Sequence, residues 1–168
     1  GSVDDLRRVT DISDEEAANS DFGTNTREEY LDVLYRLTSY RTDPDLSEIL
    51  VNSSLDTMAW LRSKGARFIL NHGRQSGMVN GKRVYFGNMP IEVNGGGAGL
   101  VQYLDAAARK AGIEVHYATR AASLIYDGER VLGVRAQHDG KAAEFRAKAV
   151  ILACGGFEAN PEMRTRYL

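Results

Sequence analysis

Apolar residues recur at intervals of three and four through the first part of the chain, which is the spacing of one face of an α-helix. Two capping boxes, at 13–16 and 26–29, predict helix starts, because a hydroxyl and a carboxylate three residues later satisfy free backbone amides. A third helix is predicted to start at Asp43, with Pro44 in the first helical position, and to end near Gly65. We expect these apolar faces to be core: Tyr30, Leu31, Val33, Leu34, Leu37, Leu46, Ile49, Leu50, Met58 and Leu61.

The middle of the chain changes to short strands and polar loops. Residues 67–70 form a strand candidate, and residues 71–99 are rich in glycine, asparagine and arginine. Within that stretch, Asn80-Gly81 between apolar runs is a strong hairpin signal. A long glycine-rich segment of this kind is either mobile or functional, and its spacing does not decide between the two. Residues 100–111 then predict a helix closed by a carboxyl-cap glycine.

The last third of the chain has short segments that are typical of strands. Its final apolar run, Ala149–Ala153, predicts a buried strand, and Asn160-Pro161 predicts the start of a helix. The expected class is therefore α/β (mixed α+β), with helices early, a β-hairpin excursion and part of a larger parallel sheet. The other predicted strands are 113–117, 121–126, 131–137 and 143–146, with a turn at 138–140.

A pair of glycines follows the predicted buried strand. Ala153, Cys154, Gly155 and Gly156 are all small, so a ligand could approach the backbone closely at the carboxyl end of a strand, where α/β sheets bind ligands. The same residues also suit a plain strand-to-turn junction. On spacing alone, both interpretations stay open.

Composition narrows the class of protein. The chain has 168 residues and a net charge of −2, which argues against a nucleic-acid binder. No stretch is apolar enough for a membrane helix, and one cysteine, Cys154, fits a reducing cytoplasm. The histidines, His72, His116 and His138, lack metal-ligand spacing, so we expect no metal site. Gly1-Ser2 is typical of a remnant left by tag cleavage.

The segments 96–100, 112–115 and 149–161, ending in Cys-Gly-Gly-Phe-Glu-Ala-Asn-Pro, resemble the FAD-dependent fumarate reductase and succinate dehydrogenase flavoprotein superfamily. Within it, the chain looks most like tricarballylate dehydrogenase and related flavoproteins labelled precorrin-3B synthase. The likeness implies a capping portion, residues 3–94, and a partial FAD-binding portion, residues 95–168.

By the same likeness, Ala121 and Ala122 fall on the strand that contacts adenine, and residues 153–156 lie beside the cofactor, with Cys154 expected as a small buried residue there. The parent protein would then use FAD to oxidise or reduce a carbon–carbon bond in a di- or tricarboxylate. A role in corrinoid biosynthesis is the alternative. In the cap, His72, Arg74 and Gln75 could orient a polycarboxylate, or they could belong to a solvated loop.

Some expected parts of a flavoenzyme are missing. The sequence contains no dinucleotide-binding unit, which would consist of a strand, a Gly-x-Gly-x-x-Gly turn and a helix, followed by an acidic residue. The glycine run 95–99 does not supply one, because no buried apolar strand precedes it. The catalytic histidine and arginines of the family are expected beyond Leu168. We therefore expect an internal fragment that is inactive, binds FAD weakly if at all, and self-associates through exposed sheet edges.

Overall fold

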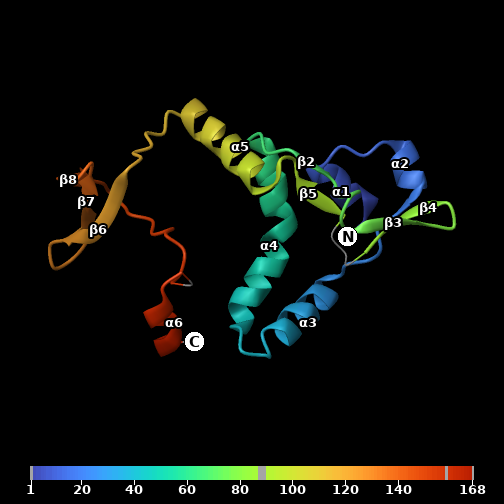
Figure 1. Ribbon diagram of the computed structural model, residues 1–168, viewed down its shortest axis with the longest axis horizontal. Coiled ribbons are helices and arrows are strands. Elements are labelled where there is room, and N and C mark those ends of the chain that lie inside the picture. The colour runs from blue at the N-terminus through green and yellow to red at the C-terminus, as the bar shows by residue number, and fades with distance from the viewer. Residues whose placement is uncertain (1, 87–89, 158, 168) are drawn as a thin grey trace. The chain divides into compact units, whose positions relative to one another are not determined.

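The computed structural model describes residues 2–86, 90–157 and 159–167. Its helices and mixed sheets confirm the α/β class (Figure 1). The chain forms two compact units, Gly1–Glu114 and Val115–Leu168. The assignment of residues 3–94 to a cap and 95–168 to an FAD-binding portion concerns roles, and it stays a prediction.

Side-chain caps begin the helices at the amino-terminal end of the first unit. Ser13 and Thr26 form the predicted capping boxes, and the Asp43 carboxylate accepts hydrogen bonds from the amides of Asp45 and Leu46. Ser2, expected to be a tag remnant, also caps a helix through a capping box. These helices are α1 (Val3–Val9), α2 (Asp14–Ala18), α3 (Arg27–Leu37) and α4 (Pro44–Ser63).

The pair α3 and α4 packs helix against helix, but most of its predicted core faces solvent. Leu37 is 81% exposed and Leu46 is 64% exposed, whereas Val51 is buried. Helical spacing defines an apolar face without specifying what covers it, and in the described residues little covers this one. The core prediction is therefore wrong for the following residues, all of which are exposed: Tyr30, Val33, Leu37, Leu46, Ile49 and Leu50.

Two small sheets complete the core of the first unit. In one, β1 pairs in parallel with β4, and β4 pairs antiparallel with β3. The predicted Asn80-Gly81 turn joins β3 to β4, with φ of 50° at Asn80 and 80° at Gly81. In the other, β2 and β5 pair antiparallel, and Phe68 and Leu70 are buried. The strands are β1 (Ser20–Asp21), β2 (Phe68–Leu70), β3 (Ser76–Val79), β4 (Lys82–Tyr85) and β5 (Ile91–Val93).

A glycine turn connects β5 directly to helix α5 (Gly96–Lys110). Gly95 has φ of 81° and lies at the helix start, and Gly99 is buried against the turn. Strand β5 does precede this glycine run, but it has only three residues, and all of them are partly exposed, so it is not a buried apolar strand. At the far end, Gly112 closes the helix as predicted, with φ of 72°.

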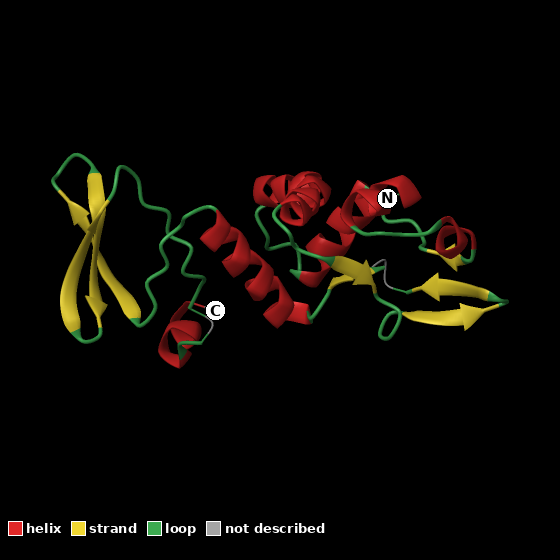
Figure 2. Cartoon of the chain, turned by 90° about the horizontal axis from the view of Figure 1, so that it is seen from above, coloured by secondary structure: helices red, strands yellow, loops and turns green. Residues whose placement is uncertain are grey.

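The second unit consists of an antiparallel sheet of order β6-β7-β8, followed by a short helix (Figure 2). Ile125 and Ala136 are buried on it. The Asp139-Gly140 turn joins the second and third strands, as predicted. The elements are β6 (Thr119–Tyr126), β7 (Val131–His138), β8 (Lys141–Arg146) and α6 (Pro161–Tyr167).

Two predicted strands do not form. Residues 113–117 and 149–153 have no strand partner in the described part of the chain, and Ile151 is 91% exposed. A strand exists only through hydrogen bonds to a neighbouring strand, so an apolar run without that neighbour stays irregular. The buried-strand prediction for Ala149–Ala153 is therefore wrong for this structure. In the described residues, we find no helix with the length and hydrophobicity needed to span a bilayer.

Candidate functional site

A groove of about 580 Å³ lies in the first unit, where the segment after α1 meets β2. It carries charged and polar groups on an otherwise apolar base that includes Val9 and Phe68, both buried. Such a mixture is typical of a site that orients a small polar ligand. The polar lining comprises Thr10, Asp11, Glu16, Arg62, Arg67, His72 and Asn94.

His72 lines this groove from the loop that follows β2. Its Nδ1 lies 3.0 Å from the hydroxyl oxygen of Tyr85, and the two ring centroids are 6.1 Å apart. Tyr85 is only 3% exposed and stacks on Phe22 at 5.0 Å. One edge of the histidine ring is therefore held by a buried tyrosine.

Burial raises the pKa of the Tyr85 hydroxyl above its ordinary value, because the phenolate would lose its hydration there. The Arg83 cation opposes this increase in pKa, and the Glu16 carboxylate adds to it. The hydroxyl of Tyr85 therefore stays protonated well above neutral pH, and it has a proton to donate.

Three of the groove's charged groups already have partners. Arg62 Nη2 lies 2.5 Å from a carboxylate oxygen of Asp11, which also lines the groove. The Glu16 carboxylate accepts hydrogen bonds from the amide and hydroxyl of Ser13, at 3.0 and 2.8 Å, and these bonds lower the pKa of Glu16. In contrast, Arg67 forms no ion pair with any residue that the structure describes. Two carboxylates, Asp11 and Glu16, and two guanidinium groups, Arg62 and Arg67, thus line the groove, and their formal charges balance.

Of the predicted substrate residues, only His72 lines the groove. Arg74 and Gln75 lie in the same loop, before β3, and they take part in hydrogen bonds through backbone atoms: Arg74 N donates to the Asn71 side chain at 3.3 Å, and the Gln75 carbonyl accepts from Phe86 N at 2.6 Å. The polycarboxylate role of these three residues stays a prediction.

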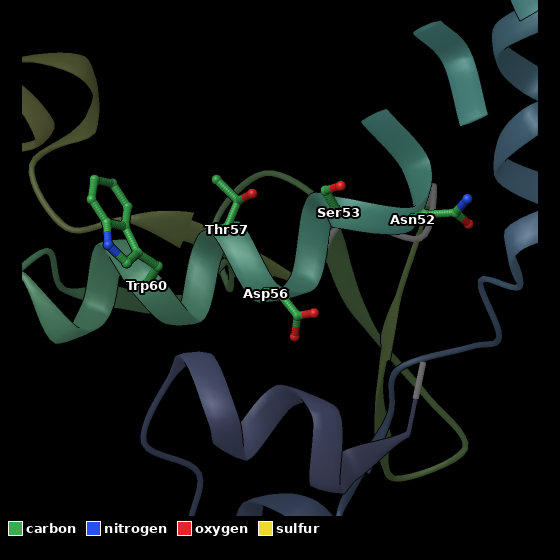
Figure 3. A pocket seen from close by; sticks show the side chains of 5 residues that line it. All are labelled: Asn52, Ser53, Asp56, Thr57 and Trp60. Atoms are coloured by element: carbon green, nitrogen blue, oxygen red, sulfur yellow. The ribbon is translucent and has the colours of Figure 1, made fainter. Parts of the chain in front are cut away.

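A second hollow, of about 460 Å³, lies on the surface of α4 (Figure 3). Asp56 bonds to Arg8 of α1 at 2.5 Å, and Lys64 lies over the Trp60 ring at 5.7 Å. Since its lining side chains all come from one helix, they do not converge on a common point. The residues are Asn52, Ser53, Asp56, Thr57 and Trp60.

The predicted cofactor residues 153–156 lie in the second unit as an exposed, irregular segment. Gly155 has φ of 71°, and a Cβ placed on it would meet no atom within 4 Å. Cys154 is a free, exposed thiol, contrary to the expectation of a buried one. Because the side chains are small and the backbone is open, these residues leave room for an adenine nucleotide, and their contact with it stays a prediction.

The other predicted cofactor residues, Ala121 and Ala122, lie on β6 and are exposed. Ala121 pairs with Ala136 and Ser123 pairs with Arg135, so Ala122 is the extra residue of a β-bulge. Bulges interrupt ladder hydrogen bonding and redirect a side chain, which is common beside binding sites. Small side chains at a bulge fit a flat ring, and their contact with adenine stays a prediction.

Histidines of the second unit have structural roles. The ring of His116 packs on Phe145, with centroids 4.8 Å apart, and His138 Nδ1 lies 2.7 Å from the Thr119 hydroxyl. Residues 113–117 do not form the predicted strand, so His116 is held by ring packing instead. Across the described residues, no group of three potential metal ligands occurs.

Comparison with known proteins shows the family of this chain. The FAD binding domain family matches residues 11–167, nearly the whole sequence. The chain belongs to that family, and FAD is the cofactor that the family match assigns to the parent protein.

Its relatives include three reductases. Urocanate reductase of Eggerthella lenta is 35% identical over 74% of this chain, and a probable fumarate reductase, Ifc3, of Shewanella frigidimarina is 33% identical over 76%. NADH:fumarate oxidoreductase of Klebsiella pneumoniae is 28% identical over 76% of this chain. The matched part of this chain covers 20%, 21% and 13% of those proteins, respectively. It thus spans about a fifth of their length or less.

Sequence reasoning missed Tyr85, Glu16 and Arg67. Tyr85 lies in an apolar run that predicts only a strand, and Glu16 was identified only as a helix cap. The groove takes Glu16 from α2, Arg67 from the segment before β2 and His72 from the loop after β2, and Tyr85 contacts His72 from the end of β4. No local spacing connects such distant positions, so only the tertiary structure could identify the site.

Proposed function

We propose that this chain is part of an FAD-dependent oxidoreductase that acts on a di- or tricarboxylate in the manner of tricarballylate dehydrogenase. The observation that carries the proposal is the open segment 153–156, with no atom within 4 Å of a Cβ at Gly155, in a chain of the FAD binding domain family. Relatives named fumarate and urocanate reductases support a carbon–carbon double bond next to a carboxylate as the reacting group.

The residues of this chain would bind and orient the reactants. FAD, when bound, supplies the hydride chemistry. Small residues at 121–122 and 153–156 leave room for its adenine side, and exposed amides can donate hydrogen bonds to it. In the first unit, His72 and Arg67 line a groove, and Arg67 has no ion-pair partner among the described residues, which suits a carboxylate. The free thiol of Cys154 fits the reducing cytoplasm in which we place the protein.

The test is a purification of the full-length protein followed by a visible flavin spectrum and a substrate panel. We expect a bound flavin whose oxidation state responds to tricarballylate, fumarate or urocanate. A flavoprotein that responds only to corrinoid precursors would support the precorrin-3B synthase alternative. A colourless protein that does not take up added FAD would refute the proposal.

We also propose, as a second function of a different class, that the 168-residue chain by itself is a self-associating module without catalytic activity. Ile151 and Leu152 are 91% and 66% exposed, and both outer strands of the β6-β7-β8 sheet have one unpaired edge in the described chain. Exposed apolar segments and open edges favour pairing with a second copy. Light scattering should show a dimer or larger species at micromolar concentration, and a monodisperse monomer would contradict this.

A further inference from the structure

Tyr85 and His72 come from different parts of the first unit, yet they share one hydrogen bond. Tyr85 is the last residue of β4, and His72 lies in the loop that leads from β2 to β3. The hydroxyl lies 3.0 Å from Nδ1, and this nitrogen is its hydrogen-bond partner within the described part of the chain. A neutral imidazole carries one proton, so the role of Nδ1 in this bond decides where that proton sits.

We propose that Tyr85 is a positioning residue that donates its hydroxyl proton to His72 Nδ1 and so places the imidazole proton on Nε2. The buried phenol keeps its own proton, and stacking on Phe22 at 5.0 Å holds its ring in place. With Nδ1 occupied, Nε2–H is the remaining hydrogen-bonding group of a ring that lines the groove. His72 thereby becomes a fixed donor.

A fixed donor determines which ligand atom the groove accepts at this point. Nε2–H binds a carbonyl or carboxylate oxygen and rejects an ammonium or amide N–H. Arg67 lines the same groove and has no ion-pair partner among the described residues, whereas Arg62 is paired with Asp11 and the Glu16 carboxylate accepts hydrogen bonds from Ser13. The His72 donor and the Arg67 guanidinium therefore select a ligand with an oxygen acceptor, most simply a carboxylate. The identity of this ligand rests on the proposed function; the proton position on His72 does not.

The test uses the ¹⁵N-labelled chain and the NMR signals of the imidazole nitrogens. Of the three histidines, His72 is assigned by its loss in His72→Gln. We expect the Nε2–H tautomer in the native chain and a mixture of tautomers in Tyr85→Phe, which keeps the ring that stacks on Phe22. Tyr126→Phe is the matched control, because its hydroxyl bonds to the Gly128 carbonyl at 2.7 Å in the other unit. An Nδ1–H tautomer or a doubly protonated ring in the native chain, or no change in Tyr85→Phe, would overturn the proposal.

Fumarate serves as the ligand probe. We expect fumarate to shift the His72 Nε2 signal in the native chain, with a several-fold weaker apparent affinity in Tyr85→Phe and no weakening in Tyr126→Phe. If the native chain has the expected tautomer but fumarate does not shift its His72 signals, the assignment of a carboxylate ligand is overturned. A full-length protein without flavin or turnover would refute the proposed function but leave the tautomer result intact, so the two failures are distinguishable.

Discussion

Gly99 of α5 lies so close to Asn94 that a Cβ on the glycine would be 2.1 Å from the Asn94 carbonyl oxygen. The carbonyl carbon of Asn94 would lie 3.1 Å away, so both clashing atoms belong to the backbone and cannot move aside cheaply. This contact sets how closely the helix start packs on the turn that follows β5, and it requires glycine at this position.

The first prediction compares two glycines of the same helix. Gly99→Ala should lower the free energy of unfolding of the first unit by about 2 kcal/mol or more, because the turn must shift to admit the methyl group. Gly97→Ala is the control: a Cβ there meets no atom within 4 Å, and alanine is favoured over glycine in a helix by about 1 kcal/mol. Urea unfolding followed by circular dichroism measures both. Equal effects would mean that the packing of α5 on the turn is not tight.

A second prediction concerns pH. The pKa of Glu16 is lowered by hydrogen bonds from Ser13, so the folded state binds this proton less tightly than the unfolded state. The stability from this group is therefore fully present above the ordinary glutamate pKa of about 4.3, and it is lost as the pH falls through the lower folded pKa.

Glu16→Gln should accordingly flatten the loss of stability in that acidic range. Glu15→Gln removes a charge from the same helical turn but leaves the capping box intact, and it is the control. Urea midpoints measured at several pH values check the difference. If the two variants lose stability in parallel as the solution is acidified, the capping box does not carry the effect.

The cofactor segment gives a third prediction. Gly155 and Gly140 have similar φ values, 71° and 78°, and a Cβ added at either would meet no atom within 4 Å, so alanine should strain both backbones equally. In the full-length protein, Gly155→Ala should weaken FAD binding about tenfold or more, equivalent to about 1.4 kcal/mol, whereas Gly140→Ala should not. Flavin fluorescence titration measures the affinities. Equal affinities would show that FAD does not approach residue 155.

Self-association gives the fourth prediction. Ile151→Lys places a charge on a side chain that is 91% exposed, so it should shift the chain towards monomer without loss of its helix and strand content. Lys148→Arg, three residues earlier on the exposed segment, leaves the charge unchanged and is the control. Sedimentation velocity separates the species. Persistence of the dimer in Ile151→Lys would place the contact elsewhere.

Local signals in the sequence predicted local structure well. The capping boxes at Ser13 and Thr26 and the Asn80-Gly81 hairpin form as expected, because each depends on residues that are neighbours along the chain. The strand expected at 149–153 does not form, since its existence depends on a partner strand that no residue of the run can specify.

The candidate site shows the same difference between local features, which the sequence indicates, and tertiary contacts, which it does not. His72 was a candidate substrate residue from its chemistry, with a solvated loop as the alternative, and the structure places it on the lining of a groove, while its substrate role stays a prediction. Tyr85 could not be identified, because its importance arises from one contact across the tertiary structure. For Gly155, the sequence predicted an open backbone and the structure has one, although the strand before it is missing.

The parallel pairing of β1 with β4 has a kinetic consequence. Ser20 aligns with Arg83, so the ladder closes a loop of about sixty residues that contains the whole α3–α4 hairpin. Contacts between residues that are distant in sequence form late, so the helices should form before the β1–β4 ladder does. Transient release of the two-residue β1 would leave β4 paired with β3, but it would loosen the adjacent Phe22, which stacks on the tyrosine that steadies the histidine, without unfolding either helix.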